Sequence, residues 1–181
     1  MAVEATTPTA IDSFISSLEE MARQESNSRA HLARLKRCAG RTLEECPEIY
    51  PLFYRLLPAS LRGQEWAEPS YFLVATLFPF APARWSGDFG ATLRMLKGQS
   101  PDHSDGLDRR MAVLLDCAHA DLPFRLRQVV QLAAAKDAPI GWRSLLQDIL
   151  RWEHPARIAQ KNWARSYFGG STATDPASTA E

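Results

Sequence analysis

Apolar residues recur at helical spacing along most of this chain, and this periodicity limits its possible folds more than any other feature. Between residues 11 and 22 they stand three or four positions apart, so they share one face of a helix. Thr9, directly after Pro8, is a candidate cap for that helix. Residues 73–78 alone could form a strand, but no partner strand is evident elsewhere. The pattern therefore indicates an all-α protein.

Further helices are expected between breaks that contain Pro or Gly. They should cover residues 28–39, 47–58, 68–78, 89–97, 107–118, 121–133, 140–152 and 155–168. The helix at 68–78 is apolar nearly all round, which predicts that it is buried. We therefore predict an all-α fold of about eight or nine helices, in one compact unit or in two small helical bundles.

The loop at residues 98–106 is the best candidate for a boundary between lobes, because it is rich in Gly, Ser and Pro. It would separate an N-terminal helical lobe at 28–97 from a C-terminal helical lobe at 107–168. An acidic segment with the first helix, residues 1–27, precedes them. Residues 169–181 have the composition of a disordered tail.

The net charge of the 181 residues is zero, but the charges are unevenly distributed. Residues 1–27 hold five acids and one base, and residues 169–181 hold two acids and no base. The stretch between them, 28–168, holds 20 bases and 14 acids, a net charge of +6. A basic body with acidic ends favours a polyanionic partner.

The composition is that of a soluble protein from a reducing compartment. Three cysteines are too few and too scattered for a disulfide framework, which favours a cytoplasmic location. No apolar run approaches the ~20 residues of a membrane span, and the first residues do not read as a signal peptide.

Basic residues lie on the expected outer faces of several helices. On the helix at 28–39, Arg34 and Arg37 project away from the apolar stripe, together with Arg29 and Lys36. Such a face either contacts phosphates or is simply solvated. Further basic residues on the later helices could likewise contact phosphates or simply be solvated. They are Arg109, Arg110, Arg125, Arg127, Arg157, Lys161 and Arg165. The last three stand four residues apart, so their like charges repel unless a polyanion neutralises them.

Evidence for catalysis or metal binding is weak in this sequence. Cys117 and His119 are zinc-type ligands, but no second pair has matching spacing. His103 stands among scattered acids in a loop, an arrangement more typical of a soluble loop than of a metal site. No phosphate-binding loop, dinucleotide fingerprint or nucleophile elbow is present. Trp142 and Trp152 lie beside apolar runs, which predicts core packing rather than base stacking.

Segments spread over residues 28–168 together resemble, in order, the CasB family. They are AHLAR at 30–34, YPLFYRLLP at 50–58, YFLVATLF at 71–78, GDFGATLRML at 87–96, DRRM at 108–111, LRQVV at 126–130, IGWRSLLQDIL at 140–150 and WAR at 163–165. The family is all-helical, has no known catalytic activity, and supplies the small subunit of the type I-E CRISPR Cascade effector complex.

The resemblance implies a non-catalytic subunit that needs no cofactor. Its partners would be other Cascade subunits, a second copy of itself, the guide RNA, and the target and non-target DNA strands. It would stabilise the guide–target heteroduplex and the displaced strand, together called the R-loop. Four arginines meet the family's basic pattern: Arg34, Arg109, Arg110 and Arg127. The other candidate contacts rest on helical-wheel geometry: Arg37, Arg125, Arg157 and Lys161.

Two other interpretations remain open. The chain is compatible with a helical protein–protein adaptor that makes no direct nucleic-acid contact. It is also compatible with a small helical metalloenzyme that uses Cys117 and His119.

Overall fold

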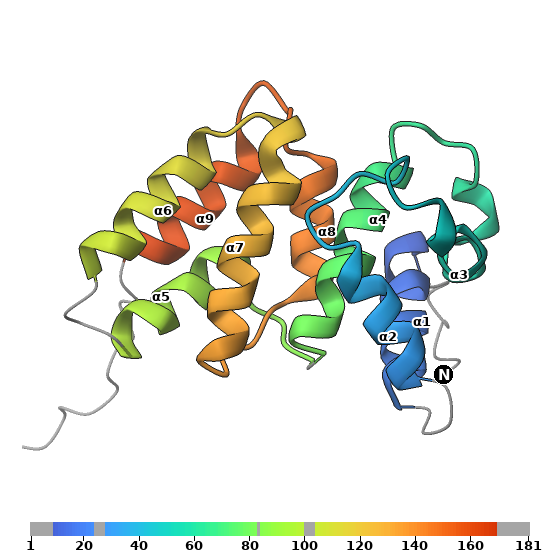
Figure 1. Cartoon of the computed structure of the whole chain (residues 1–181). Coiled ribbons are helices and arrows are strands. Elements are labelled where there is room, and N and C mark those ends of the chain that lie inside the picture. Colours follow the sequence, from blue (N-terminus) through green and yellow to red (C-terminus); the bar gives the residue numbers. More distant parts are fainter. Residues whose placement is uncertain (1–8, 24–27, 83, 100–103, 170–181) are drawn as a thin grey trace, which may run out of the picture.

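The computed structural model describes residues 9–23, 28–82, 84–99 and 104–169, and it is all-helical over these ranges (Figure 1). The described residues contain nine α-helices and no strand, which confirms the predicted all-α fold. The helices are α1 (Ala10–Arg23), α2 (Ser28–Arg37), α3 (Tyr50–Leu56), α4 (Glu68–Leu77), α5 (Phe89–Gln99), α6 (Ser104–Asp116), α7 (Leu122–Ala135), α8 (Trp142–Leu150) and α9 (Ile158–Phe168). Short 3₁₀ turns join some of them: η1 (Pro47–Ile49), η2 (Ala59–Leu61), η3 (Phe78–Phe80) and η5 (His119–Asp121). No helix in the described ranges is long and apolar enough to span a membrane.

The first helix begins directly after Thr9, the residue that the sequence predicted as its cap. The backbone N–H of Asp12 donates to Thr9 Oγ1 at 3.2 Å, and the Thr9 N–H donates back to Asp12 Oδ2 at 3.2 Å. This reciprocal pair satisfies backbone donors that the first helical turn leaves without partners.

Several helix ends differ from the prediction by a few residues, and three of these ends lie at or near candidate residues. Helix α2 ends at Arg37, and the chain turns at Gly40, whose φ is +80°. Helix α6 ends at Asp116, so Cys117 and His119 lie outside it. Helix α9 begins at Ile158 rather than near Pro155. The apolar spacing continues past some helix ends because apolar residues in the following turns are buried as well. The spacing of apolar residues alone therefore does not show where a helix ends.

Helix α4 is the buried centre of the fold, as its uniform apolar character predicted. Every residue from Ser70 to Leu77 is buried. Helix α4 packs against α2, α7 and α8, so helices from both halves of the chain meet on it. Trp142 and Trp152 are buried too, which confirms the prediction that they pack in the core.

Helix α5 makes its most extensive contact with α9, across a glycine. A Cβ placed on Gly90 would lie 2.2 Å from the carbonyl oxygen of Trp163, so only glycine permits this approach. The rings of Phe89 and Trp163 then pack at 5.1 Å between centroids. The buried apolar residues form one connected cluster from Phe14 to Tyr167. The predicted division into lobes stays a prediction. The predicted loop at 98–106 is shorter in the structure, because α5 extends to Gln99 and α6 begins at Ser104. Residues 100–103 and the predicted tail from residue 170 onward lie outside the described residues.

Candidate nucleic-acid interface

Helix α2 carries two candidate arginines that have different surroundings. Arg37 is exposed in the last turn of the helix. Arg34 is half-buried, and its Nη2 donates to the carbonyl oxygen of Glu48 at 2.6 Å. Arg34 therefore joins α2 to η1, a contact that the helical wheel could not reveal. Lys36, on the same helix, lies 4.5 Å from the centre of the Phe80 ring, a cation–π contact with η3.

Helix α6 presents Arg109 and Arg110 to solvent. The carboxylate of the preceding residue, Asp108, is engaged by side chains of two other helices. It accepts hydrogen bonds from Lys97 Nζ at 2.7 Å and from the Tyr167 hydroxyl at 2.6 Å. The hydrogen bond from Lys97 and that from Tyr167 lower the pKa of the Asp108 carboxyl.

Helix α7 carries Arg127 next to the end of α2. A Cβ placed on Gly40 would lie 2.8 Å from Cδ of Arg127, so the arginine stem lies directly against the glycine. Gly40 follows Arg37 by three residues, which places two candidate cations from distant parts of the sequence in one region. Arg127 itself is exposed, as are Gln128 and Gln131 on the same helix.

Arg125, also on α7, is half-buried. Its guanidinium carbon lies 5.6 Å from the centre of the Phe124 ring. The Phe124 side chain is 55% exposed. Arg125 therefore covers an apolar surface with its side chain and offers its charge at the edge of that surface.

Helix α9 does not carry the predicted stripe of three cations, because Arg157 lies outside the helix. Arg157 is the residue before α9, in the left-handed conformation with φ 49° and ψ 48°. Its guanidinium donates to the carbonyl oxygen of Leu115 and lies 4.0 Å from the Asp116 carboxylate. Lys161 and Arg165 are exposed on α9 as predicted. Arg157 thus serves at least in part to join α9 to the end of α6.

Four exposed arginines form what we call the α2–α6–α7 basic surface: Arg37, Arg109, Arg110 and Arg127. Helices α6 and α7 pack against each other, and α7 lies between α6 and the end of α2 (Figure 1). The six ion pairs identified between described residues engage other cations, namely Arg23, Arg84, Lys97, Arg143 and Arg157. This surface is the strongest candidate for contact with a phosphate backbone.

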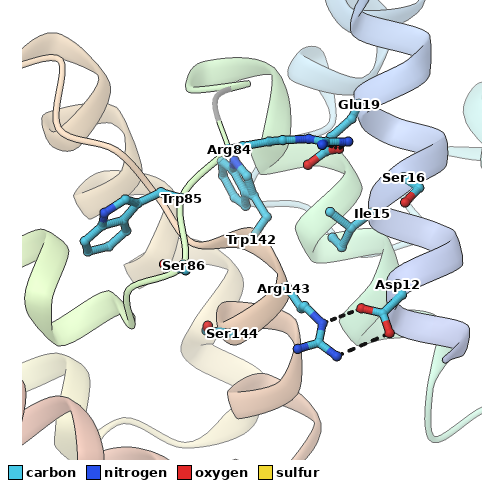
Figure 2. A pocket seen from close by; sticks show the side chains of 10 residues that line it. All are labelled: Asp12, Ile15, Ser16, Glu19, Arg84, Trp85, Ser86, Trp142, Arg143 and Ser144. Carbon is cyan, nitrogen blue, oxygen red and sulfur yellow. Dashed lines mark hydrogen bonds and ion pairs between the residues drawn. The ribbon is translucent and has the colours of Figure 1, made fainter. Parts of the chain in front are cut away.

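A cavity of ≈ 490 Å³ lies elsewhere, between α1, α8 and the segment at residues 84–86 (Figure 2). Two ion pairs line it: Arg143 with Asp12, and Arg84 with Glu19, whose Arg84 Nε to Glu19 Oε2 distance is 2.6 Å. The hydrogen bond from Arg143 lowers the pKa of Asp12 to about 2, so this acid stays ionised. The opposite charges compensate each other, so each of the two carboxylates that line the cavity is paired with an arginine.

The helical architecture is shared with proteins of one known family. The sequence model of the family "CRISPR-associated protein Cse2" matches residues 31–168. The chain belongs to the Cse2 family. The predicted resemblance to the CasB family is thereby confirmed, since solved structures under both names share this fold.

A Cse2 relative from Thermus thermophilus is 31% identical over 140 residues, which cover 75% of this chain and 79% of that protein. The crystal structure of a Cse2-family protein from the same organism has a TM-score of 0.74 at 27% identity, covering 87% of this chain and 96% of its own. The crystal structure of CasB from M. ruber has a TM-score of 0.71 at 27% identity, covering 90% and 94%. A chain of a CRISPR RNA-guided surveillance complex shares the fold, with a TM-score of 0.73 at 18% identity, covering 88% and 92%.

Sequence reasoning missed two features of this Cse2-family chain. The acids of the first helix are partly used inside the protein, since Asp12 and Glu19 pair with Arg143 and Arg84. The three-ligand cluster found among the described residues is also not the one weighed from sequence: it contains Cys38, Cys46 and Glu48. Cys117, by contrast, donates its thiol hydrogen to the carbonyl oxygen of Leu114 at 3.2 Å.

Proposed function

We propose that this protein is a non-catalytic small subunit of a type I-E CRISPR surveillance complex, and that it stabilises the R-loop through basic surface residues. Its partners would be the other subunits, a second copy of itself, the guide RNA and both DNA strands. Membership of the Cse2 family supports the assembly, and the described fold is shared with a chain of an RNA-guided surveillance complex.

The observation that carries the nucleic-acid role is the α2–α6–α7 basic surface. Its arginines come from three helices, yet Arg127 lies against Gly40 at the end of α2, and α6 packs on α7. A surface made of exposed guanidinium groups suits phosphate contact and carries no base-specific readout.

The energetics of R-loop formation make such contacts effective. The RNA–DNA heteroduplex is about as stable as the DNA duplex it replaces, so strand exchange is nearly balanced. Contacts that hold the heteroduplex or the displaced strand therefore shift the equilibrium towards the open state. A subunit with this role needs a basic surface and no reactive group.

The test is the R-loop lifetime of the assembled complex at two salt concentrations. One variant removes three cations of the surface: Arg109→Ala, Arg110→Ala and Arg127→Ala. A matched control removes three exposed arginines elsewhere: Arg55→Ala, Arg62→Ala and Arg151→Ala. We expect the first variant to shorten the lifetime, and the control to leave it unchanged.

The difference between wild type and the surface variant should shrink as salt rises. Each lost phosphate contact lowers the salt slope of binding by about 0.7 to 0.9, so three contacts lower it by about two. Equal lifetimes at both salt concentrations would show that the surface is only solvated.

A helical adaptor without nucleic-acid contact is the second candidate, and it is favoured by the exposure of Phe124 on α7, 55%. Large exposed aromatic side chains suit protein contacts. The same assay with Phe124→Ala separates the two roles, because loss of an adaptor contact would make that variant dissociate from the complex, whereas the arginine variant should stay bound and shorten the R-loop lifetime.

A further inference from the structure

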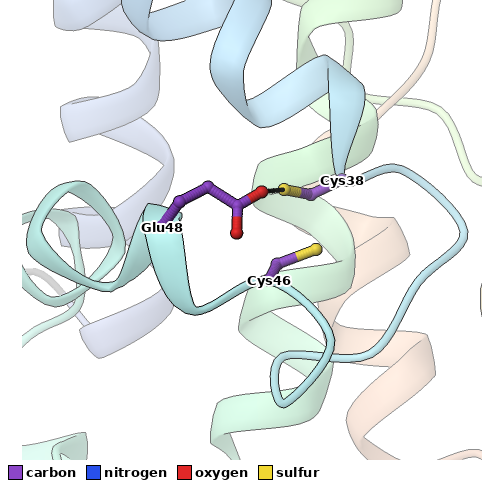
Figure 3. Close-up of side chains that lie close together, drawn as sticks. All are labelled: Cys38, Cys46 and Glu48. Atoms are coloured by element: carbon purple, nitrogen blue, oxygen red, sulfur yellow. Dashed lines mark hydrogen bonds between the residues drawn. The ribbon is translucent and has the colours of Figure 1, made fainter.

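Two cysteines and a glutamate meet where the chain passes from α2 to η1 (Figure 3). Cys38 directly follows α2, Cys46 directly precedes η1, and Glu48 lies within η1. One ligand atom from each, the two Sγ atoms and a carboxylate oxygen, all lie within 4.8 Å of one another. The Cys38 thiol donates to Glu48 Oε1 at 3.8 Å.

A backbone turn and a side-chain hydrogen bond hold these three residues together. The left-handed turn at Gly40 reverses the chain after α2 and lets residues 41–46 return towards the helix. Arg34, on α2, then donates to the carbonyl oxygen of Glu48 and so holds η1 against the helix. The cluster therefore rests on contacts that exist without any bound ion, as a preorganised site requires.

We propose that Cys38, Cys46 and Glu48 form a binding site for a zinc-class divalent cation, with a water molecule as the fourth ligand. Two sulfur ligands select soft or borderline cations over Mg²⁺ and Ca²⁺, which prefer all-oxygen sites. Zn–S bonds of about 2.3 Å in a tetrahedron place ligand atoms about 3.8 Å apart. The three ligand atoms therefore need to approach one another by no more than about 1 Å.

The two thiols of the proposed site are buried, while its carboxylate is exposed, and this arrangement would let an ion enter from solvent. Cys38 and Cys46 are buried at 1% and 0% exposure, while Glu48 is exposed. The carboxylate side therefore faces solvent and gives a path for the ion and for the water ligand. The thiol side is dry, which strengthens the attraction between thiolates and a dication.

Proton exchange balances the charge. Burial, together with the neighbouring Cys46 and Glu48, raises the pKa of the Cys38 thiol to about 12, so a free thiolate is disfavoured there. A dication removes this penalty: two S–Zn bonds form, and the two thiol protons leave to solvent. Metal uptake is therefore expected to strengthen as pH rises.

The test uses reduced, chelator-washed full-length protein titrated with Co²⁺, followed by displacement with Zn²⁺. We expect one Co²⁺ per chain, with thiolate-to-cobalt absorption in the near ultraviolet and the visible bands of tetrahedral cobalt. Cys38→Ser and Cys46→Ser should each lose the thiolate absorption. Cys117→Ser is the matched control and should behave as wild type.

Glu48→Gln keeps the proposal testable if the buried serine variants fail to fold, because Glu48 is exposed. It should bind Co²⁺ at least ~10-fold more weakly than wild type, by analogy with loss of metal-supporting groups. Zn²⁺ should raise the melting temperature of wild type and of Cys117→Ser more than that of Glu48→Gln. Absence of cobalt absorption in wild type with three titratable thiols would overturn the site. Persistence of the absorption in folded Cys38→Ser or Cys46→Ser would overturn it equally.

Discussion

Replacing Asp148 by Asn should stabilise the protein at neutral pH. Asp148 lies on α8, and its Oδ2 accepts a hydrogen bond from Trp163 Nε1 at 2.6 Å. Burial raises the pKa of this carboxyl to about 6 from 3.8, the charge of Asp88 raises it too, and the Trp163 hydrogen bond opposes the shift. The ionised carboxylate thus costs free energy in the folded protein.

The sign of the effect follows from the direction of the pKa shift. Below pH 3.8 the carboxyl is protonated in both states, and its contribution to stability is fully present. The contribution is lost as pH rises through about 6, where the folded protein must release the proton. A shift of about two pKa units corresponds to about 3 kcal/mol. Partial solvent access reduces this to about 1 to 2 kcal/mol. Asn carries no charge and keeps an oxygen that can accept from Trp163.

The free energy of unfolding should be measured by urea denaturation between pH 4 and pH 7.5, with tryptophan fluorescence as the signal. Asp148→Asn should exceed wild type by about 1 to 2 kcal/mol at pH 7.5, and the difference should nearly vanish at pH 4. Asp121→Asn is a matched control, because Asp121 is exposed and makes no side-chain cap hydrogen bond. An Asp148→Asn variant that is less stable than wild type at pH 7.5 but not at pH 4 would refute the reasoning, because the charged hydrogen bond to Trp163 would then outweigh the burial cost.

Three further outcomes are expected. Gly40→Ala should lower the free energy of unfolding by about 1 to 2 kcal/mol, because the φ of residue 40 is +80° and the new Cβ would contact the Arg127 side chain. A double-mutant cycle should show a smaller loss when Arg127 is already replaced by Ala. Arg34→Ala should cost about 1 kcal/mol in the same denaturation assay, since it removes the hydrogen bond to the Glu48 carbonyl. The purified protein should leave labelled DNA and RNA intact in Mg²⁺ or Mn²⁺, and cleavage that persists through repeated purification would contradict a non-catalytic role.

The helical fold could be predicted because its evidence is local. Helix α4 is apolar on nearly all sides, and it is buried from Ser70 to Leu77. Thr9 was recognisable as a cap because Ser, Thr, Asp and Asn satisfy the free N–H groups of a first helical turn. These signals act within a few residues, so one sequence is enough to find them. Helix ends were less predictable, because tertiary packing continued the apolar pattern into turns.

The roles of individual cations were less predictable, because a helical wheel shows direction but not what lies there. Arg34 points away from the apolar stripe of α2 and still finds the carbonyl of Glu48, 14 residues later. Arg157 has the spacing of a stripe with Lys161, yet its left-handed backbone removes it from the helix. Both outcomes depend on long-range packing, which the spacing of charges does not encode.

The net charge of a sequence segment does not show which charged side chains of this protein are free to bind a partner. By sequence, the first 27 residues are acidic and the body is basic, which suggests a polyanion site spread over the whole body. In the structure, Asp12 and Glu19 of α1 neutralise Arg143 and Arg84, so these two cations are partly screened from an external polyanion. Arg37 and Arg127 of the α2–α6–α7 basic surface take part in none of the ion pairs identified between described residues. The internal pairing of the N-terminal acids thus removes Arg84 and Arg143 as competing cations, while Arg37 and Arg127 stay available on the face where a nucleic-acid backbone is proposed to lie.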